Sequence, residues 1–337
     1  MIIKKLNRIL LAAAFIGLLN SCDQELDVST KGQNMPVVFA IINPEDSIHS
    51  IRISHSFRGN PDGAILAQSP DSTCYDTLAP KLEFYTKTGW KYHEINFLPV
   101  QNSIREEGYF SRQGLQLYQF HSKTSEYFIK GTHVVLNIPK GPQQDKITAI
   151  AEYIEPPRIF APKQGLHTNL DFYPVSVEVS FEDPPEFVRY ELHVICNIKN
   201  IMKSGDTVLQ TIDKTFTRDS GNDGVAREYS HLSILVPGDL ILAQVKKEVK
   251  IDNQVDYRLF DRIEFQLHTG SAEFYNYIDL NRMSDDYGGQ VISNITGGLG
   301  VFALKYQTKV TNIFLGPITM DSLIHGRYTR NLNFKDW

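Results

Sequence analysis

Stretches in which apolar and polar residues alternate dominate the chain after residue 35. The clearest are residues 48–57, where Ile51 and Ile53 have polar neighbours, and residues 187–197, which include Leu192. Alternation with a period of two predicts strands that bury one face, and the clusters of Gly, Pro, Asn and Asp between them predict turns. Further strands are expected at residues 37–42, 82–85, 92–97, 108–110, 115–120, 127–129, 133–138, 147–154, 175–181, 207–217, 232–236, 240–251, 257–268 and 302–315. A short polar tail is expected from there to Trp337.

Prolines divide this β-rich region into two parts. Pro156, Pro157 and Pro162 interrupt the strand pattern, and proline removes a ladder donor and stiffens a linker. We therefore predict an N-terminal β-sandwich domain at residues 35–155 and a C-terminal β-sandwich domain at residues 156–330. The predicted fold class is mainly β, with immunoglobulin-like or transthyretin-like sandwiches, because many short strands separated by turn residues are typical of that architecture.

One segment follows a helical period instead. Phe274, Tyr277 and Ile278 recur at a spacing of one to four residues, and Ser271 precedes them as a plausible N-cap. This spacing places the three apolar side chains on one face of a helix, and a serine at that position satisfies free backbone N–H groups. We predict a single helix, near residues 271–284, inserted in the second domain.

Two other stretches are predicted to be loops or turns. Residues 64–77 are polar and irregular, which indicates an excursion from the first domain. Gly297, Gly298 and Gly300 follow the predicted helix and precede a strand. This order is the reverse of the strand–loop–helix order of phosphate-binding loops, so we interpret the glycines as a tight turn with close backbone packing.

The first 25 residues have the pattern of an export signal. Lys4, Lys5 and Arg8 precede an unbroken apolar run at residues 9–19. An ordinary transmembrane helix needs about 20 apolar residues, so this run is too short to be one. A charged start, a short apolar core and small residues at its end are typical of a cleaved signal peptide.

The end of this signal resembles the lipobox of bacterial lipoproteins, Leu-x-(Gly/Ala/Ser)-Cys. Leu19, Ser21 and Cys22 occupy its defining positions. The resemblance implies cleavage between Ser21 and Cys22 and acylation of Cys22, which would anchor the chain to a membrane, with the polar residues 22–34 as a tether. The alternative is an ordinary secretory signal in which a cysteine happens to follow the cut.

Loss of the signal makes the chain more acidic. Residues 1–21 contain three basic residues and no acidic one, so the net charge moves from −5 to −8. This balance argues against a nucleic-acid partner, which favours basic patches. With Cys22 acylated, Cys74 and Cys196 remain. Their distance in the sequence favours two separate thiols over a disulfide, and Cys196 lies in an apolar strand where we expect it in the core.

The candidate motifs for chemistry are weak. The ten histidines include no pair at zinc-protease spacing, and there is no Cys-x-x-Cys. Residues 219–224 resemble a calcium loop only in part, because Gly221 replaces a ligand. The adjacent carboxylates, Glu106 with Glu107 and Asp285 with Asp286, point to opposite faces of a strand or into solvent. We predict no catalytic residue, no metal site and no cofactor.

Aromatic side chains offer one further possibility. Trp90 and the many Tyr and Phe residues are able to stack on a sugar. Sheets also use aromatic residues for core and cross-strand packing, and we favour that interpretation. A glycan hydrolase would in addition need two carboxylates about 5 to 9.5 Å apart in a groove.

The segment from residue 268 to residue 302 resembles an uncharacterised family of Bacteroidetes outer-membrane lipoproteins, a domain of unknown function. The resemblance rests on Phe274-Tyr275-Asn276-Tyr277, Ser293-Asn294-Ile295 and Gly297-Gly298-Leu299-Gly300-Val301-Phe302, with Ile51-Arg52-Ile53-Ser54, Ile129-Lys130-Gly131-Thr132 and Ile147-Thr148-Ala149 in the first half. It implies a two-domain, β-rich protein, often encoded beside TonB-dependent receptors, to which no catalytic residues transfer.

These observations lead to a functional hypothesis. We expect a non-enzymatic protein anchored to the outer membrane through acyl chains on Cys22, on either the cell surface or the periplasmic face. Its expected role is that of an accessory or binding partner of a TonB-dependent transporter. The alternative is a fimbrial or adhesin-like structural subunit, which requires a releasable strand for donor-strand exchange.

Overall fold

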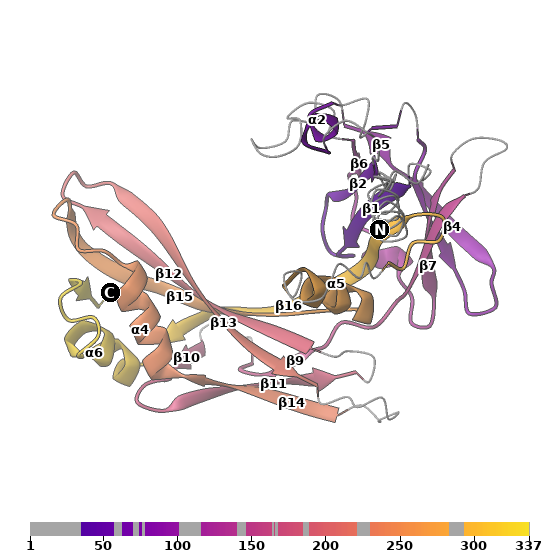
Figure 1. Ribbon diagram of the computed structural model, residues 1–337. Coiled ribbons are helices and arrows are strands. Elements are labelled where there is room, and N and C mark those ends of the chain that lie inside the picture. Colours follow the sequence, from indigo (N-terminus) through magenta and orange to yellow (C-terminus); the bar gives the residue numbers. More distant parts are fainter. Residues whose placement is uncertain are drawn as a thin grey trace, which may run out of the picture.

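The computed structural model shows two β-sandwiches joined by one long strand (Figure 1). It describes residues 35–56, 63–69, 74–75, 78–100, 116–139, 146–163, 165, 168–184, 189–220, 230–282 and 293–336. The predicted export signal, lipobox and tether, and the strand predicted at 108–110, lie outside these residues. In the part of the chain that the structure describes, no helix is long and apolar enough to cross a membrane.

The N-terminal sandwich consists of two facing sheets. One contains β1 (Pro36–Ile42), β2 (His49–His55), β6 (Leu117–Phe120) and β5 (Leu98–Pro99), and the other β3 (Lys81–Tyr85), β4 (Lys91–Asn96), β7 (His133–Ile138) and β8 (Ile147–Glu152). The alternation predicted at residues 48–57 is confirmed: Ile51 and Ile53 of the first sheet join Leu82 and Phe84 of the second in one buried apolar cluster. Burial of this apolar surface is the main force that holds the two sheets together.

The C-terminal sandwich has longer strands. Its larger sheet contains β12 (Arg189–Met202), β13 (Thr207–Asp219), β15 (Val255–Gly270) and β16 (Leu299–Leu315), with β10 (Thr168–Leu170) and β17 (Phe334–Lys335) at its margins, and its smaller sheet β9 (Ile159–Ala161), β11 (Ser176–Asp183) and β14 (Ser230–Pro237). The rings of Phe181 and Tyr190 meet between the two sheets with centroids 4.7 Å apart. The Tyr190 hydroxyl donates a hydrogen bond to Asp183 at 2.7 Å, so this buried tyrosine has a partner.

Strand β16 connects the two sandwiches, as Figure 1 shows. Its first part, residues 299–304, pairs in parallel with β1, and residues 305–313 pair antiparallel with β15. The predicted second domain therefore supplies a strand to the first. The predicted boundary at residue 155 assigns that strand to the second domain alone. Gly300 is essential to this pairing, because its φ is +115° and a Cβ there would overlap the Val38 carbonyl oxygen.

The structure contains more helices than the sequence predicts. Among the described residues they are α2 (Gly63–Ala67), η1 (Ser125–Tyr127), α4 (Gly238–Glu248), α5 (Ala272–Arg282) and α6 (Pro317–His325). The helix predicted near residues 271–284 is confirmed as α5, but the loop predicted from residue 64 begins as α2, and η1 takes Tyr127 out of the strand predicted there.

Two of the sequence predictions for the second half are wrong. The pattern predicts a strand at residues 240–251, yet α4 buries Ile241, Leu242 and Val245 at helical spacing. The apolar run from Leu240 to Leu242 is too short to distinguish a helical period of 3.6 residues from a strand period of two. Tertiary packing decided between the two. The polar tail expected after residue 315 instead contains α6, which starts at a proline suited to a first helical turn.

Candidate functional site

The structure does not bring the residues predicted from the sequence into one site. Ser21 and Cys22 lie outside the described residues, as do Glu106, Glu107 and the pair Asp285 and Asp286. Within the partial calcium loop, Asp219 makes an ion pair with Arg189 at 3.0 Å, and the loop after residue 220 is outside the described part. Among the described residues, no group of three His, Cys, Asp or Glu side chains is arranged to hold a metal ion.

The glycine and cysteine predictions agree with the structure. Gly297 has a φ of +78° and packs on the Lys146 carbonyl, and Gly298 packs on that of Pro36, as expected for a tight turn. No disulfide joins Cys74 to Cys196. Cys196 is buried in the core, and this burial raises the pKa of its thiol to about 12, so it is uncharged and unreactive.

A groove of about 470 Å³ lies at one end of the N-terminal sandwich. It is lined by the turn between β3 and β4, the segment that enters β7 and the segment that leaves β8. Two main-chain segments are held together here, because the Tyr153 N–H donates to the Thr132 carbonyl at 3.0 Å. Gly131 has a φ of +78°, and a Cβ there would overlap the Lys87 side chain. A volume of this size falls in the range of ligand sites.

The lining of the groove is polar and carries both signs of charge. Lys87 and Lys130 contribute ammonium groups, and Glu152 and Glu155 contribute carboxylates. Lys130 and Glu155 form an exposed ion pair at 3.5 Å. Such a surface suits a partner or ligand that presents both charges, and it differs from the water-excluded pocket that most catalysis requires.

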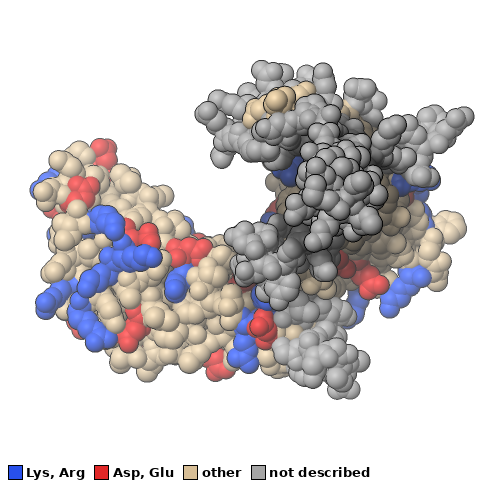
Figure 2. All heavy atoms as spheres, viewed as in Figure 1, with Lys and Arg blue, Asp and Glu red and all other residues tan. Residues whose placement is uncertain are grey.

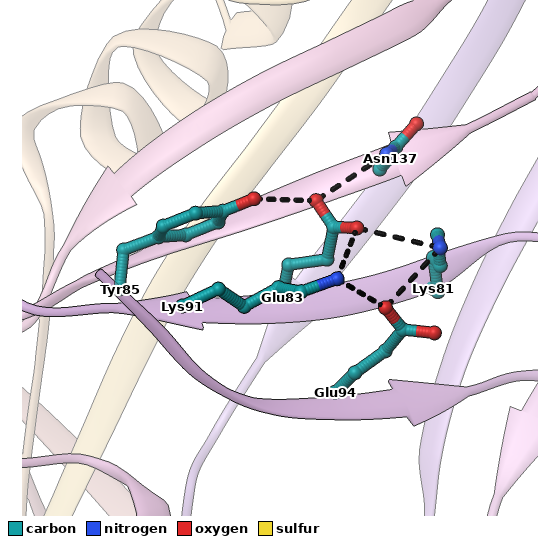
Figure 3. A network of polar contacts seen from close by, with 6 residues as sticks. All are labelled: Lys81, Glu83, Tyr85, Lys91, Glu94 and Asn137. Carbon is teal, nitrogen blue, oxygen red and sulfur yellow. Dashed lines mark hydrogen bonds and ion pairs between the residues drawn. The ribbon is translucent and has the colours of Figure 1, made fainter. Parts of the chain in front are cut away.

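Next to the groove, the outer face of the β3–β4–β7 sheet carries a network of polar side chains around Glu83 (Figure 3). Leu82 and Phe84 point into the core, so Lys81, Glu83 and Tyr85 point outward. Glu83 is only 6% exposed. Alternation along one short strand is sufficient to place all three polar side chains on the same face.

Glu83 has a full set of hydrogen-bond partners. It accepts from the Tyr85 hydroxyl at 2.9 Å, from Asn137 Nδ2 at 3.3 Å and from Lys91 Nζ at 3.4 Å, and Lys81 Nζ lies 3.4 Å away. Burial raises the pKa of Glu83, but the hydrogen bonds outweigh burial and the net pKa is below the ordinary value. The carboxylate is therefore charged at neutral pH and is not a general acid.

Glu94 is the cross-strand neighbour of Glu83 and shares both lysines. Lys91 Nζ lies 2.8 Å and Lys81 Nζ 3.2 Å from Glu94 Oε2. The two lysines thus neutralise the two carboxylates, and their hydrogen bonds hold the pKa of Glu94 below its usual value. This pair is an ionic network that ties adjacent strands together, and it lacks the protonated member that an acid/base pair needs.

Aromatic rings connect this network to the groove. Tyr85 stacks on His133, which lines the groove, with ring centroids 5.4 Å apart and planes 4° from parallel. Trp90, in the turn between β3 and β4, is 72% exposed. The prediction that aromatic residues serve core packing is therefore wrong for Trp90, whose ring is available to a partner. The sequence signal for the exposure of Trp90 was its position in a turn that also contains Gly89 and Lys87.

Charges are mixed over the rest of the visible surface. Figure 2 shows Lys and Arg side chains interspersed with Asp and Glu across the C-terminal sandwich. Interspersed charges favour solubility over the attraction of one strongly charged partner.

The fold is that of a mainly β protein of two sandwiches, the first of which carries a polar groove. No family model matches the chain, and no curated protein matches it. Among solved structures, CBD12 from CALX1.2 is 8% identical, over 81% of this chain and 100% of that chain, with a TM-score of 0.17. Trypsin-activated alpha-2-macroglobulin from Escherichia coli is 10% identical, over 84% of this chain and 16% of that chain, with a TM-score of 0.19.

Proposed function

We propose that the protein is a lipid-anchored, non-enzymatic component of a bacterial outer membrane that acts as an accessory or binding partner of a TonB-dependent transporter. The observation that carries the proposal is the groove beside Lys87 and Lys130, which has the volume and mixed charge of a recognition site. The resemblance of residues 19–22 to a lipobox and of residues 268–302 to the outer-membrane family supports the location and the partner.

The anchor would keep the groove near the membrane. The tether, residues 22–34, is a polar segment of 13 residues that leads into β1 of the sandwich that carries the groove. A flexible chain of that length has an end-to-end distance of about 20 Å. Each buried methylene contributes about 0.8 kcal/mol, so two or more acyl chains on Cys22 would hold the protein stably. A membrane-embedded partner is then always within reach.

Within the groove, the contacts would be electrostatic and polar. Lys87 would face a carboxylate of the partner, and Glu152 would face a cation. Exposed ion pairs of this kind contribute about 0.2–1 kcal/mol each. They favour correct orientation and fast association more than affinity, which suits a partner that the shared membrane already concentrates.

Co-purification from membranes tests this proposal. The tagged full chain is extracted in mild detergent, and we expect a barrel transporter among the recovered proteins. Lys87→Glu should reduce that recovery, whereas Lys123→Glu, an exposed lysine outside the groove, should not. Recovery of no transporter, together with neighbouring genes that encode none, would remove the basis of the proposal.

The anchor has its own test. Cys22→Ser should move the protein from the outer-membrane fraction to a soluble fraction, and protease treatment of intact cells reports which side of the membrane it occupies. A Cys22→Ser protein that stays in the outer membrane would contradict lipid anchoring.

One observation bears on the fimbrial alternative. A fimbrial subunit leaves a strand position open for a neighbour, yet β1, the first strand after the tether, is paired on both sides, with β2 and with the chain's own β16. Ladders of bands on gels of unboiled samples would support the fimbrial alternative over the proposed one.

A further inference from the structure

A second cavity lies where the two sandwiches meet, and it is distinct from the groove. Its volume is about 90 Å³. Asp46 reaches it from the turn between β1 and β2, Glu191 from β12, His268 from β15, Tyr275 from α5 and Lys305 from β16. Side chains from both sandwiches therefore share one small space, and the strand that joins the sandwiches forms part of its wall.

The charged groups of this cavity are not matched to each other. Glu191 and Lys305 both line it, but neither forms an ion pair within 4.0 Å with any side chain that the structure describes. Asp46 accepts a hydrogen bond from Asn43 Nδ2 at 2.9 Å, which leaves acceptor capacity on its carboxylate. Asp46, Glu191 and Lys305 are half-buried, so each has hydrogen-bonding capacity left for a ligand in the cavity.

His268, which also lines the cavity, carries a polar atom without a partner. Its Nε2 is buried and has no hydrogen-bond partner among the described residues. Burial, followed by His193 and Lys305, lowers the pKa of His268 to about 4, so the ring is neutral at pH 7. A buried polar atom without a partner is rare in proteins and calls for an explanation.

We infer that this junction cavity binds a small zwitterion of the α-amino-acid class. The ligand's carboxylate would lie at Lys305 and its ammonium group at Glu191 and Asp46, beside the neutral ring of His268. An anion alone would leave the two carboxylates unmatched, and a cation alone would leave Lys305 unmatched. A cavity of 90 Å³ has room for about six water-sized groups, which corresponds to glycine or alanine.

Isothermal titration of the full chain in detergent tests this inference. Glycine and L-alanine should bind, whereas acetate and methylamine, which each carry one of the two charges, should bind at least about tenfold more weakly. Glycine betaine, whose ammonium group has no N–H and is larger, should not bind. Equal binding of acetate and glycine, or no binding of either amino acid, would overturn the inference.

Variants connect any binding to the cavity. Lys305→Met and Glu191→Gln should each weaken glycine binding by about tenfold or more. Lys309→Met is the matched control, because Lys309 is an exposed lysine on the same strand that does not line the cavity. Circular dichroism identifies a variant that fails to fold. If Lys305→Met fails to fold, Glu191→Gln alone tests the inference. Unchanged glycine affinity in a folded cavity variant, or a loss in Lys309→Met as well, would also overturn the inference.

The inference does not depend on a transporter partner. It concerns only the junction between the sandwiches, so failed co-purification and failed titration are separate results.

Discussion

Glu83 and His268 are titratable groups on faces of two different sheets, and their surroundings differ in kind. Glu83 has hydrogen bonds or ion pairs with Tyr85, Asn137 and two lysines, and its pKa lies below the ordinary value because those partners outweigh burial. His268 Nε2 has no partner in the described structure, and burial is the largest cause of its lowered pKa. The Glu83 carboxylate has its partners within the chain, although Asn137 Oδ1 next to it is buried without one, and His268 Nε2 has none among the described residues.

This difference separates a stabilising network from a candidate binding site. A partly buried polar group stabilises a fold when its hydrogen bonds are made, and it costs free energy when they are not. The lysines around Glu83 are satisfied without any further molecule. Glu191 and Lys305 of the junction cavity form no ion pair with any side chain that the structure describes, which is why we place the new binding site at the junction.

The largest expected effect on stability comes from a substitution that disrupts the pairing of β1 with β16. Gly300→Ala should lower the free energy of unfolding by about 3 kcal/mol or more, because the left-handed φ and the Val38 carbonyl both oppose a side chain. Chemical denaturation measures the loss, and hydrogen exchange should show it in β1 and the first part of β16.

Gly89→Ala is the matched control for this change. Gly89 has a φ of +81°, but a Cβ there meets no atom within 4 Å. Only backbone strain remains, so the expected cost is about 1 kcal/mol. Equal losses at the two glycines would show that β1 does not depend on close packing against β16.

The next largest effect on stability is expected when Glu83 is removed from its network of hydrogen bonds and ion pairs. Glu83→Ala should lower the free energy of unfolding by about 2 kcal/mol, because Tyr85, Asn137 and the lysines lose a shared acceptor. Glu155→Ala, which removes an exposed ion pair with Lys130, should cost less than about 0.5 kcal/mol. Similar costs for the two substitutions would mean that burial of Glu83 does not matter.

The pH dependence of stability distinguishes the two groups. The pKa of His268 is about 4 in the folded protein, and the ordinary value for histidine in an unfolded chain is 6.5. Between these values the unfolded chain binds the proton first, so stability falls as the pH drops from 6.5 towards 4. The lowered pKa of Glu83 also removes stability on acidification, but only below about its reference value of 4.5.

Thermal melts at several pH values measure this effect. His268→Gln should flatten the fall between pH 6.5 and 4. If the profile of His268→Gln matches that of the unchanged chain, then His268 is not the group that titrates.

The smallest effect is expected for one donor of the Glu83 network. Tyr85→Phe removes the hydroxyl that donates to Glu83 at 2.9 Å and leaves the ring that stacks on His133. The expected cost is about 1 kcal/mol, with a rise in the pKa of Glu83 that NMR titration would detect. No measurable cost would show that the stacked ring, and not the hydrogen bond of the hydroxyl to Glu83, is what Tyr85 contributes to this face.

Much of the local structure follows from the sequence. The alternation at residues 187–197 predicts β12, because a sheet with one buried face requires a period of two. The spacing of Phe274 and Tyr277 predicts α5 for the analogous reason. The predicted signal and the lipobox resemblance around Cys22 also come from the sequence alone, and they stay predictions.

The tertiary structure decided the rest. Residues 240–248 became a helix because packing, not local preference, selected between two periods that a short apolar run fits equally. Neither the groove nor the junction cavity has a sequence motif, since their side chains come from segments that are distant along the chain. The parallel pairing of β1 with β16 brings two of those segments together. Spacing along a chain encodes which face a side chain occupies, but only the folded backbone determines which faces meet.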